Sequence, residues 1–189
     1  IPQAYYNKRE GITKLSTETG AGQWGSALSF ACNQIGIECL VFMVRASYEQ
    51  KPYRKIMMQT YGGKVFPSPS DQTEIGRKLL EDKDNYNGSL GMAISEAVEI
   101  AIQRKDTHYT LGSVLNHVLL HQSIVGEEAR LALEDIGDYP DIVIGCVGGG
   151  SNFGGLIIPF LKENLTKGKK TKFLGVEPKN LLFKTGNYI

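Results

Sequence analysis

Apolar positions along the chain fall into two patterns, continuous runs of strand length and periods of helical spacing. Residues 37–44 and 141–147 are continuous apolar runs, typical of parallel strands covered on both faces. Residues 21–35 and 90–104 place apolar side chains at helical spacing. Shorter patterns predict further strands over residues 13–17, 64–66 and 172–177, and further helices over residues 49–61, 71–82, 114–136 and 153–165. The alternation indicates an α/β protein with open parallel sheets and helices on both faces.

Glycine, proline and capping residues mark where several of these elements begin and end. Gly36 supplies a stop for the first of these helices, and Pro52 is tolerated in the first turn of the helix over residues 49–61. Ser70 and Asp71 are candidate caps of the helix that follows them. Pro159 interrupts the last helical pattern, so we expect a kink there.

Composition narrows the class of partner. The chain has 189 residues, of which 41% are hydrophobic and 22% charged, and its formal net charge is +1. A packed globule is therefore expected, and the charge balance gives no reason to expect nucleic acid or a membrane as partner. The lysine-rich stretch over residues 167–172 is interpreted as a solvated loop. The apolar runs are far shorter than the roughly 20 residues that span a bilayer.

Cysteine usage and the first residues bear on the cellular context. Cys32, Cys39 and Cys146 lie in apolar runs and form no CxxC pair, which indicates buried thiols in a reducing, cytoplasmic compartment. The first residues have neither the apolar core of a signal peptide nor an initiator methionine. We therefore expect the sequence to begin inside a larger protein, with faces of the strands over residues 37–44 and 141–147 left bare.

The most specific chemical signal is a glycine-rich segment, Gly148-Gly149-Gly150-Ser151-Asn152, between an apolar strand and a helix. Glycines let the backbone approach a bound group closely, and the helix presents unpaired N–H groups and the positive end of its dipole. An anion such as phosphate is stabilised there. The segment matches neither the Walker loop nor the dinucleotide fingerprint. The alternative is a tight turn without a ligand, which three consecutive glycines would weaken needlessly.

Residues 18–25, Glu-Thr-Gly-Ala-Gly-Gln-Trp-Gly, repeat this strand-to-helix arrangement. A second cluster of N–H groups at a helix start suits a second anion, such as a substrate carboxylate. Glu18 follows the strand, where ligands bind in open α/β sheets. A desolvated carboxylate there would have a raised pKa and could act as a general acid or base. The residues alone favour equally a plain charge that interacts with the helix dipole.

The histidines give a weaker signal. His117 and His121 stand four residues apart on a predicted helix and could place two metal ligands on one face. His108 is not spaced to join them, and the sequence contains no HExxH motif. Packing or hydrogen bonding is therefore favoured, and no metal site is predicted.

ETGAGQWG together with GGGSN resembles the β-subunit of tryptophan synthase, a fold-type-II pyridoxal-phosphate enzyme. The segments ETGAGQWGSAL, VRASYEQKPYRKIMMQTYG, PSPSDQTEIGRKLL and LGSVLNHVLLHQSIVGEEA are similar to the second β-subunit type, common in archaea and some bacteria. The similarity covers essentially the whole chain. It implies pyridoxal 5'-phosphate as cofactor and a lyase that replaces the hydroxyl of L-serine by indole to give L-tryptophan.

The resemblance implies a role for each matched residue. Those that would hold the cofactor phosphate are Gly148, Gly149, Gly150, Ser151 and Asn152. Those that would bind the substrate carboxylate are Thr19, Gly20, Ala21, Gly22, Gln23 and Trp24. Glu18 would be the acid/base group that assists loss of the serine hydroxyl and orients indole. Trp24 stands where the commoner β-subunit type has histidine, so its side-chain contribution is an open question.

The resemblance also implies a domain organisation and partners. Residues 1–139 would form an N-terminal-type α/β domain that includes a mobile communication region over about residues 11–98. Residues 140–189 would begin the domain that binds the cofactor phosphate, with Tyr139-Pro140 at the crossing. The complete protein would be a homodimer with a weak or absent α-subunit partner.

The family's covalent lysine is expected in an HKIN-like segment a few residues before the position of Ile1. Lys8 and Lys14 lack that context and are interpreted as surface residues. This chain alone would therefore be inactive. Two alternatives remain: a fragment that binds an anion without turnover, and another fold-type-II activity such as serine or threonine deamination. Glu18 in the ETGAGQ context speaks against the deaminase.

Overall fold

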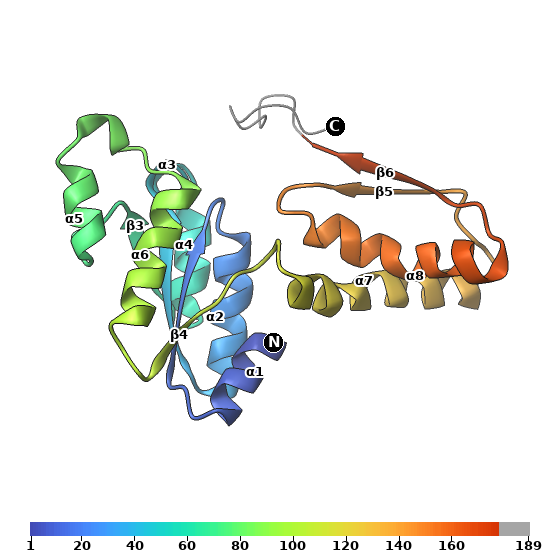
Figure 1. The fold of residues 1–189 in the computed structure, drawn as a ribbon, viewed down its shortest axis with the longest axis horizontal. Coiled ribbons are helices and arrows are strands. Elements are labelled where there is room, and N and C mark those ends of the chain that lie inside the picture. The colour runs from blue at the N-terminus through green and yellow to red at the C-terminus, as the bar shows by residue number, and fades with distance from the viewer. Residues whose placement is uncertain (178–189) are drawn as a thin grey trace. The chain divides into compact units, whose positions relative to one another are not determined.

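The computed structural model describes residues 1–177, which divide into two compact units (Figure 1). The first unit is Ile1–Leu111, and the second begins at Gly112. The sequence pattern instead suggests a crossing at Tyr139-Pro140. The structural division comes earlier because helix α7 (Asn116–Asp135) packs along helix α8 (Ser151–Lys167). The part of the expected second domain over residues 178–189 lies outside the described residues.

The first unit is built on four parallel strands in the order β3-β2-β1-β4. The central strands are β1 (Lys14–Thr19) and β2 (Glu38–Val44), and the outer strands are β3 (Lys64–Ser68) and β4 (Thr107–Tyr109). The strands expected over residues 13–17, 37–44 and 64–66 are thereby confirmed. β4 was not predicted, because three residues with a polar centre carry no readable alternation.

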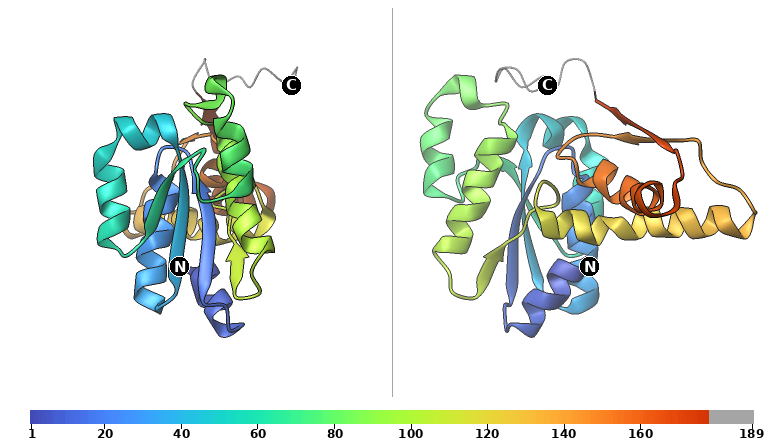
Figure 2. Two further views of the ribbon diagram at one scale, coloured as in Figure 1. Left: turned by 90° about the vertical axis from the view of Figure 1, so that its left-hand side faces the viewer. Right: turned by 45° about the vertical axis from the view of Figure 1, so that its right-hand side comes forward.

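Helices cover both faces of this sheet, which confirms the predicted α/β class. On one face, α2 (Gln23–Ile35) and α4 (Pro52–Thr60) enclose a core that includes Leu15, Leu28 and Met58. The other face is covered by α6 (Leu90–Ile102) (Figure 2). This helix packs against Phe42 through Ala93 and Ala97. The remaining helical elements are α1 (Pro2–Arg9), α3 (Arg45–Gln50), α5 (Glu74–Leu80) and a 3-10 turn over Lys83–Asn85.

The second unit pairs α7 and α8 beneath two parallel strands, β5 (Ile142–Cys146) and β6 (Lys172–Val176). A β-carbon added at Gly126 of α7 would overlap the carbonyl oxygen of Leu156 in α8. Glycine therefore lets the two helix backbones approach closely. α8 covers β5 on one side, whereas four apolar side chains of the two strands are about half exposed: Ile142, Ile144, Leu174 and Val176.

Proline affects two helices in different ways. The helix expected over residues 49–61 is two helices, α3 and α4, which are separated at Lys51. Pro52, the first residue of α4, has no N–H with which to continue the helix before it. The helix expected over residues 153–165 begins earlier, at Ser151, and continues through Pro159 in one piece.

The cap of α5 also differs from the prediction. The helix begins after Thr73, whose hydroxyl accepts a hydrogen bond from the N–H of Gly76 at 2.9 Å. Ser70 does not cap it, because its hydroxyl donates to Glu96 of α6. Asp71 is exposed and precedes the helix. The helix is therefore capped by Thr73 and not by the predicted Ser70 or Asp71.

The expected burial of thiols and strands is met only in part. Cys32 and Cys39 are buried, but Cys146 is exposed, contrary to the prediction, because it lies on β5. β2 is covered on both faces, so the expected exposure is found at β5 and not at β2. Among the described helices, none is long and apolar enough to cross a membrane.

Candidate functional site

Glu18 lies near the carboxyl end of β1, a central strand of the sheet in the first unit. It is 4% exposed, although it is a carboxylate just before a loop. Its register partner on β2 is Phe42, which is 1% exposed and belongs to the core on the α6 face. The sequence therefore places a carboxylate beside an aromatic core at the edge where ligands bind in such sheets.

The Glu18 carboxylate has one side-chain donor within the described residues. The hydroxyl of Tyr109 donates to its Oε2 at 2.6 Å. Burial raises the pKa of Glu18 above its ordinary value, and the hydrogen bond from Tyr109 offsets part of that rise. Burial and the neighbouring Glu18 both raise the pKa of Tyr109, so this phenol stays protonated. A carboxyl group with a raised pKa is suited to general acid and base catalysis.

The loop after Glu18 leads directly into α2. Gly22 precedes the helix with a φ of +95°, which favours glycine, and it provides no side-chain cap. Gly22 itself cannot cap the helix, so within the described residues the N–H groups of Gln23 and Trp24 have no side-chain acceptor. Thr19 is buried, and its hydroxyl oxygen accepts a hydrogen bond from the N–H of Gly25 at 3.2 Å. Ala21 and Gln23 are exposed, so the loop is open to an anion from solvent.

Trp24 uses its indole N–H inside the protein. The N–H donates to the hydroxyl oxygen of Thr17 at 2.7 Å, and that hydroxyl donates to the carbonyl of Thr110 at 2.6 Å. Trp24 therefore ties the start of α2 to β1 and to the residue after β4. Its side-chain N–H is occupied, which leaves the backbone of the loop as the group available to an anion.

The glycine-rich segment joins β5 to α8 in the second unit. Gly150 precedes α8 with a φ of +96° and provides no side-chain cap. Ser151 is 3% exposed, and its hydroxyl lies 2.9 Å from the hydroxyl of Ser113. Asn152 donates from Nδ2 to the carbonyl of Cys146 at 3.2 Å, so it braces the end of β5. Sequence reasoning missed Ser113, which precedes α7 without any distinguishing motif.

The segment has the properties that a phosphate group requires. A β-carbon added at Gly148 or at Gly150 would meet no atom within 4 Å, so the backbone there faces open space. Gly149, by contrast, is so close to Ser113 that a β-carbon would overlap its side chain. The N–H of Ser151 donates to the hydroxyl oxygen of Ser113 at 3.4 Å, whereas the N–H groups of Asn152 and Phe153 have no side-chain acceptor within the described residues and complete a cradle for a dianion. The residues present therefore fit a phosphorylated cofactor.

A second buried carboxylate stands outside both predicted segments. Glu96 of α6 is 0% exposed and accepts hydrogen bonds from the hydroxyls of Ser68 and Ser70, from the N–H of Ser70 at 3.1 Å and from the hydroxyl of Thr73 at 2.8 Å. These donors belong to the end of β3 and the segment between β3 and α5. Glu96 therefore fixes that segment to α6, and no sequence motif singled it out.

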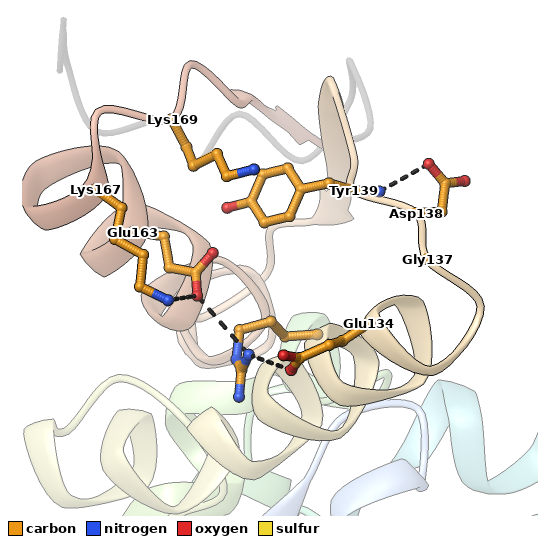
Figure 3. Close-up of a pocket in the computed structure, with 8 residues that line it drawn as sticks. Glu134, Gly137, Asp138, Tyr139, Glu163, Lys167 and Lys169 are labelled. Atoms are coloured by element: carbon orange, nitrogen blue, oxygen red, sulfur yellow. Dashed lines mark hydrogen bonds and ion pairs between the residues drawn. The ribbon is translucent and has the colours of Figure 1, made fainter.

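The histidine pair and a pocket of the second unit share no residue with the predicted binding segments. The rings of His117 and His121 meet edge to face with centroids 5.9 Å apart. Within residues 1–177, no group of three side chains is arranged to hold a metal ion. The pocket, of about 340 Å³, is lined by Arg130, Glu134, Gly137, Asp138, Tyr139, Glu163, Lys167 and Lys169 (Figure 3). None of the predicted site residues lines it.

The charged residues that line this pocket are paired with one another or with an aromatic ring. Glu163 of α8 is 7% exposed. Its Oε1 forms ion pairs with Nζ of Lys167 at 2.9 Å and with Nη1 of Arg130 of α7 at 3.7 Å. Lys169 stacks over the ring of Tyr139 with its Nζ 4.1 Å from the centroid. Two members of the basic stretch interpreted as a solvated loop are thus engaged at the ends of α7 and α8. The pocket residues precede β5 or follow the middle of α8 in the chain, whereas the glycine-rich segment lies between these two elements.

Comparisons with known proteins identify relatives of this chain. Residues 3–186 match the family described as pyridoxal-phosphate dependent enzymes. The chain is 56% identical over 180 residues to tryptophan synthase beta chain 2 of Methanothermobacter thermautotrophicus, covering 95% of this chain and 42% of that relative. It is 57% identical over 179 residues to the chain of the same name from Pyrococcus furiosus, covering 95% and 40%. The chain thus spans about two fifths of these relatives.

Solved structures show the same fold at low sequence identity. A threonine deaminase from T.th. matches with a TM-score of 0.65 and 21% identity, covering 93% of this chain and 49% of that one. A hydrogen sulfide-producing enzyme from Fusobacterium nucleatum matches with a TM-score of 0.65 and 18% identity, covering 95% and 47%. At these identities the likeness concerns the fold alone.

Proposed function

Because this chain belongs to the family of pyridoxal-phosphate-dependent enzymes, we propose that the whole protein replaces the hydroxyl of L-serine by indole to give L-tryptophan. The high identity to chains named tryptophan synthase beta chain 2 supports this reaction over others of the family. The observation that carries the proposal is Glu18, a buried carboxyl group of raised pKa followed by a loop that leads into the start of α2.

Gly148 to Asn152 would hold the phosphate of the cofactor. The N–H groups of Asn152 and Phe153 at the start of α8 and the open backbone at Gly148 and Gly150 support this assignment. Asn152 would contribute less through its amide, since that group already braces Cys146. When bound, the pyridoxal ring supplies an electron sink for the bonds broken at the amino acid.

The loop from Thr19 to Trp24 would bind the carboxylate of the substrate. Its binding groups would be the backbone N–H groups at the start of α2, because the indole N–H of Trp24 is engaged by Thr17. The exposed positions Ala21 and Gln23 leave the loop accessible. Two helix starts in one chain would thus serve two different anions.

Glu18 would move protons and orient the nucleophile. In its protonated form it gives its proton to the serine hydroxyl, so that the C–O bond breaks and water leaves in place of hydroxide. The carboxylate that remains accepts a hydrogen bond from the N–H of indole and orients the ring for attack. Burial raises the pKa of Glu18 and so favours the protonated carboxyl group that the first of these steps requires.

The test uses the whole protein with serine and indole. Glu18→Gln keeps the shape of the side chain but cannot give or take the proton, so tryptophan formation should fall by about a hundredfold or more. Cofactor absorbance should be unchanged, because Glu18 is not among the proposed phosphate contacts. A Glu18→Gln protein that makes tryptophan at the parent rate would refute the proposal.

Serine or threonine deamination is the competing activity. The likeness to threonine deaminase is one of fold, at 21% identity. The two activities separate when product formation from serine is compared with and without indole. Tryptophan that depends on indole supports the proposal, and pyruvate that forms at the same rate regardless of indole refutes it.

Partners and compartment follow from the same proposal. We infer a homodimer of the whole protein with a weak or absent α-subunit partner, as the resemblance implies. The thiols Cys32 and Cys39, which form no disulfide, support a reducing compartment and hence the cytoplasm. Sizing of the whole protein, alone and with an α-subunit, tests the assembly.

A further inference from the structure

We infer that Tyr109 is a positioning residue for Glu18, an inference that rests on the proposed function. Its phenol donates to Oε2 of Glu18 at 2.6 Å and so holds one carboxylate oxygen. The other oxygen, Oε1, is left to exchange a proton with the substrate. Tyr109 thus acts on the reaction through Glu18 and not by touching the substrate.

The register of the sheet brings the two side chains together. Tyr109 of β4 pairs with Ser16 of β1, and Glu18 lies two residues further along β1. Side chains two residues apart point to the same face of a strand. That face is the one covered by α6, because Tyr109 packs against the cluster of Phe42, Ala93 and Ala97. Glu18 is therefore held in an apolar setting with a single phenolic donor beside it.

β4 itself is held in place by a second tie. The hydroxyl of Thr17, on the residue next to Glu18, donates to the carbonyl of Thr110, the residue next to Tyr109. Trp24 in turn donates to that hydroxyl, so the loop before α2 is part of the same chain of bonds. A strand of three residues would have little to fix it by ladder bonds alone. Two consecutive residues of β1 are thus tied to Tyr109 and to the residue that follows it.

The hydrogen bond also sets the proton affinity of Glu18. Burial favours the neutral form of the carboxyl group, whereas donation from Tyr109 favours the charged form. No other side chain within residues 1–177 donates a hydrogen bond to the carboxylate of Glu18. Removal of the phenolic hydroxyl should therefore raise the pKa of Glu18 further, because the hydrogen bond that favours its charged form is lost.

A purely structural role for Tyr109 makes a different prediction. If the ring serves only to fill the space beside Phe42 and Ala97, Tyr109→Phe keeps the ring and changes nothing that depends on pH. If the hydroxyl tunes Glu18, the same substitution moves the pH dependence while the fold stays intact. The two roles are separated by one oxygen atom.

The experiment compares Tyr109→Phe with a matched control, Tyr61→Phe, in the whole cofactor-loaded protein. Tyr61 lies at the end of α4, where its ring packs against Phe30, a contact that phenylalanine retains. The first measurement is the pH dependence of the rate at which serine loses its hydroxyl. The second is the carbon-13 shift of the Glu18 carboxyl group as a function of pH, which needs no turnover.

For Tyr109→Phe we expect the basic limb of the rate profile and the titration of Glu18 to move to higher pH. The KM for serine should stay within about twofold, and Tyr61→Phe should match the parent. An unchanged titration of Glu18 in a folded Tyr109→Phe protein overturns the inference. That outcome leaves the proposed function standing as long as Glu18→Gln still abolishes tryptophan formation. A fully active Glu18→Gln protein removes both.

Discussion

The buried carboxylate of Glu96 allows a sharp prediction about stability. Its Oε1 accepts from the N–H of Ser70, the hydroxyl of Ser70 and the hydroxyl of Thr73, and its Oε2 accepts from the hydroxyl of Ser68. No ion pair with Glu96 occurs among the described residues. The carboxylate is thus held by neutral donors only. Three of them contact Oε1 and one contacts Oε2, so the two oxygens differ in what can replace them.

Glu96→Gln and Glu96→Ala should therefore lower the free energy of unfolding by different amounts. In Glu96→Gln the amide oxygen can face the three donors at Oε1, and the new NH₂ faces Ser68, whose hydroxyl rotates to accept. We expect the free energy of unfolding to fall by about 1–2 kcal/mol, because hydrogen bonds to a charged acceptor become hydrogen bonds to a neutral one. Glu96→Ala leaves four buried donors without an acceptor and a cavity beside them, so the loss should be about 3–5 kcal/mol.

The assay is urea unfolding of the whole protein, with hydrogen exchange of residues 68–80 to localise the effect. Glu99→Gln is the matched control, because Glu99 also contacts this segment, through the N–H groups of Glu74 and Ile75, but at a partly exposed position. Its loss should be smaller than that of Glu96→Ala. Equal losses for Glu96→Gln and Glu96→Ala, or none for either, would refute the reasoning from donor geometry.

Three further predictions follow from the site and from the second unit. Since burial raises the folded-state pKa of Glu18, its stabilising contribution is present at low pH and is lost as pH rises through that pKa; Glu18→Gln should therefore raise the melting temperature more at pH 8 than at pH 5, and equal shifts would contradict this. Gly150→Ala imposes a φ of +96° on alanine, so it should cost about 1–2 kcal/mol and weaken cofactor binding measured by absorbance, whereas full affinity at unchanged stability would count against the cradle. This chain alone should self-associate on sizing through the exposed apolar face of β5 and β6, and a monodisperse monomer would contradict this expectation.

Local backbone requirements were readable from the sequence because they act within a few residues. Gly22 and Gly150 were singled out as members of glycine-rich turns, and both adopt positive φ just before a helix. Their roles in binding remain predictions. The apolar runs of β2 and β5 located two strands, since a run of that length is a property of the segment itself.

Features that depend on distant partners were not readable. Tyr109 looked like one of nine scattered tyrosines, and only the pairing of β4 with β1 brings it to Glu18. Ser70 was expected to cap α5, but its hydroxyl donates to Glu96, which lies 26 residues away in sequence. Ser113 gained significance only from its contact with Ser151. In each case a short polar side chain or a phenol has several possible partners, and the tertiary fold selects one.

The exposed apolar face of β5 and β6 affects how the chain is expected to behave during synthesis. Within residues 1–177 each of these strands pairs with one partner, so its other edge carries N–H and C=O groups that no described strand pairs. An apolar face with open edges is the kind of surface that holdase chaperones bind and that seeds cross-β assembly. The nascent chain should therefore depend on chaperones most strongly after β6 has left the ribosome. Charged substitutions at Ile144 or Leu174 should lessen that dependence in the isolated chain.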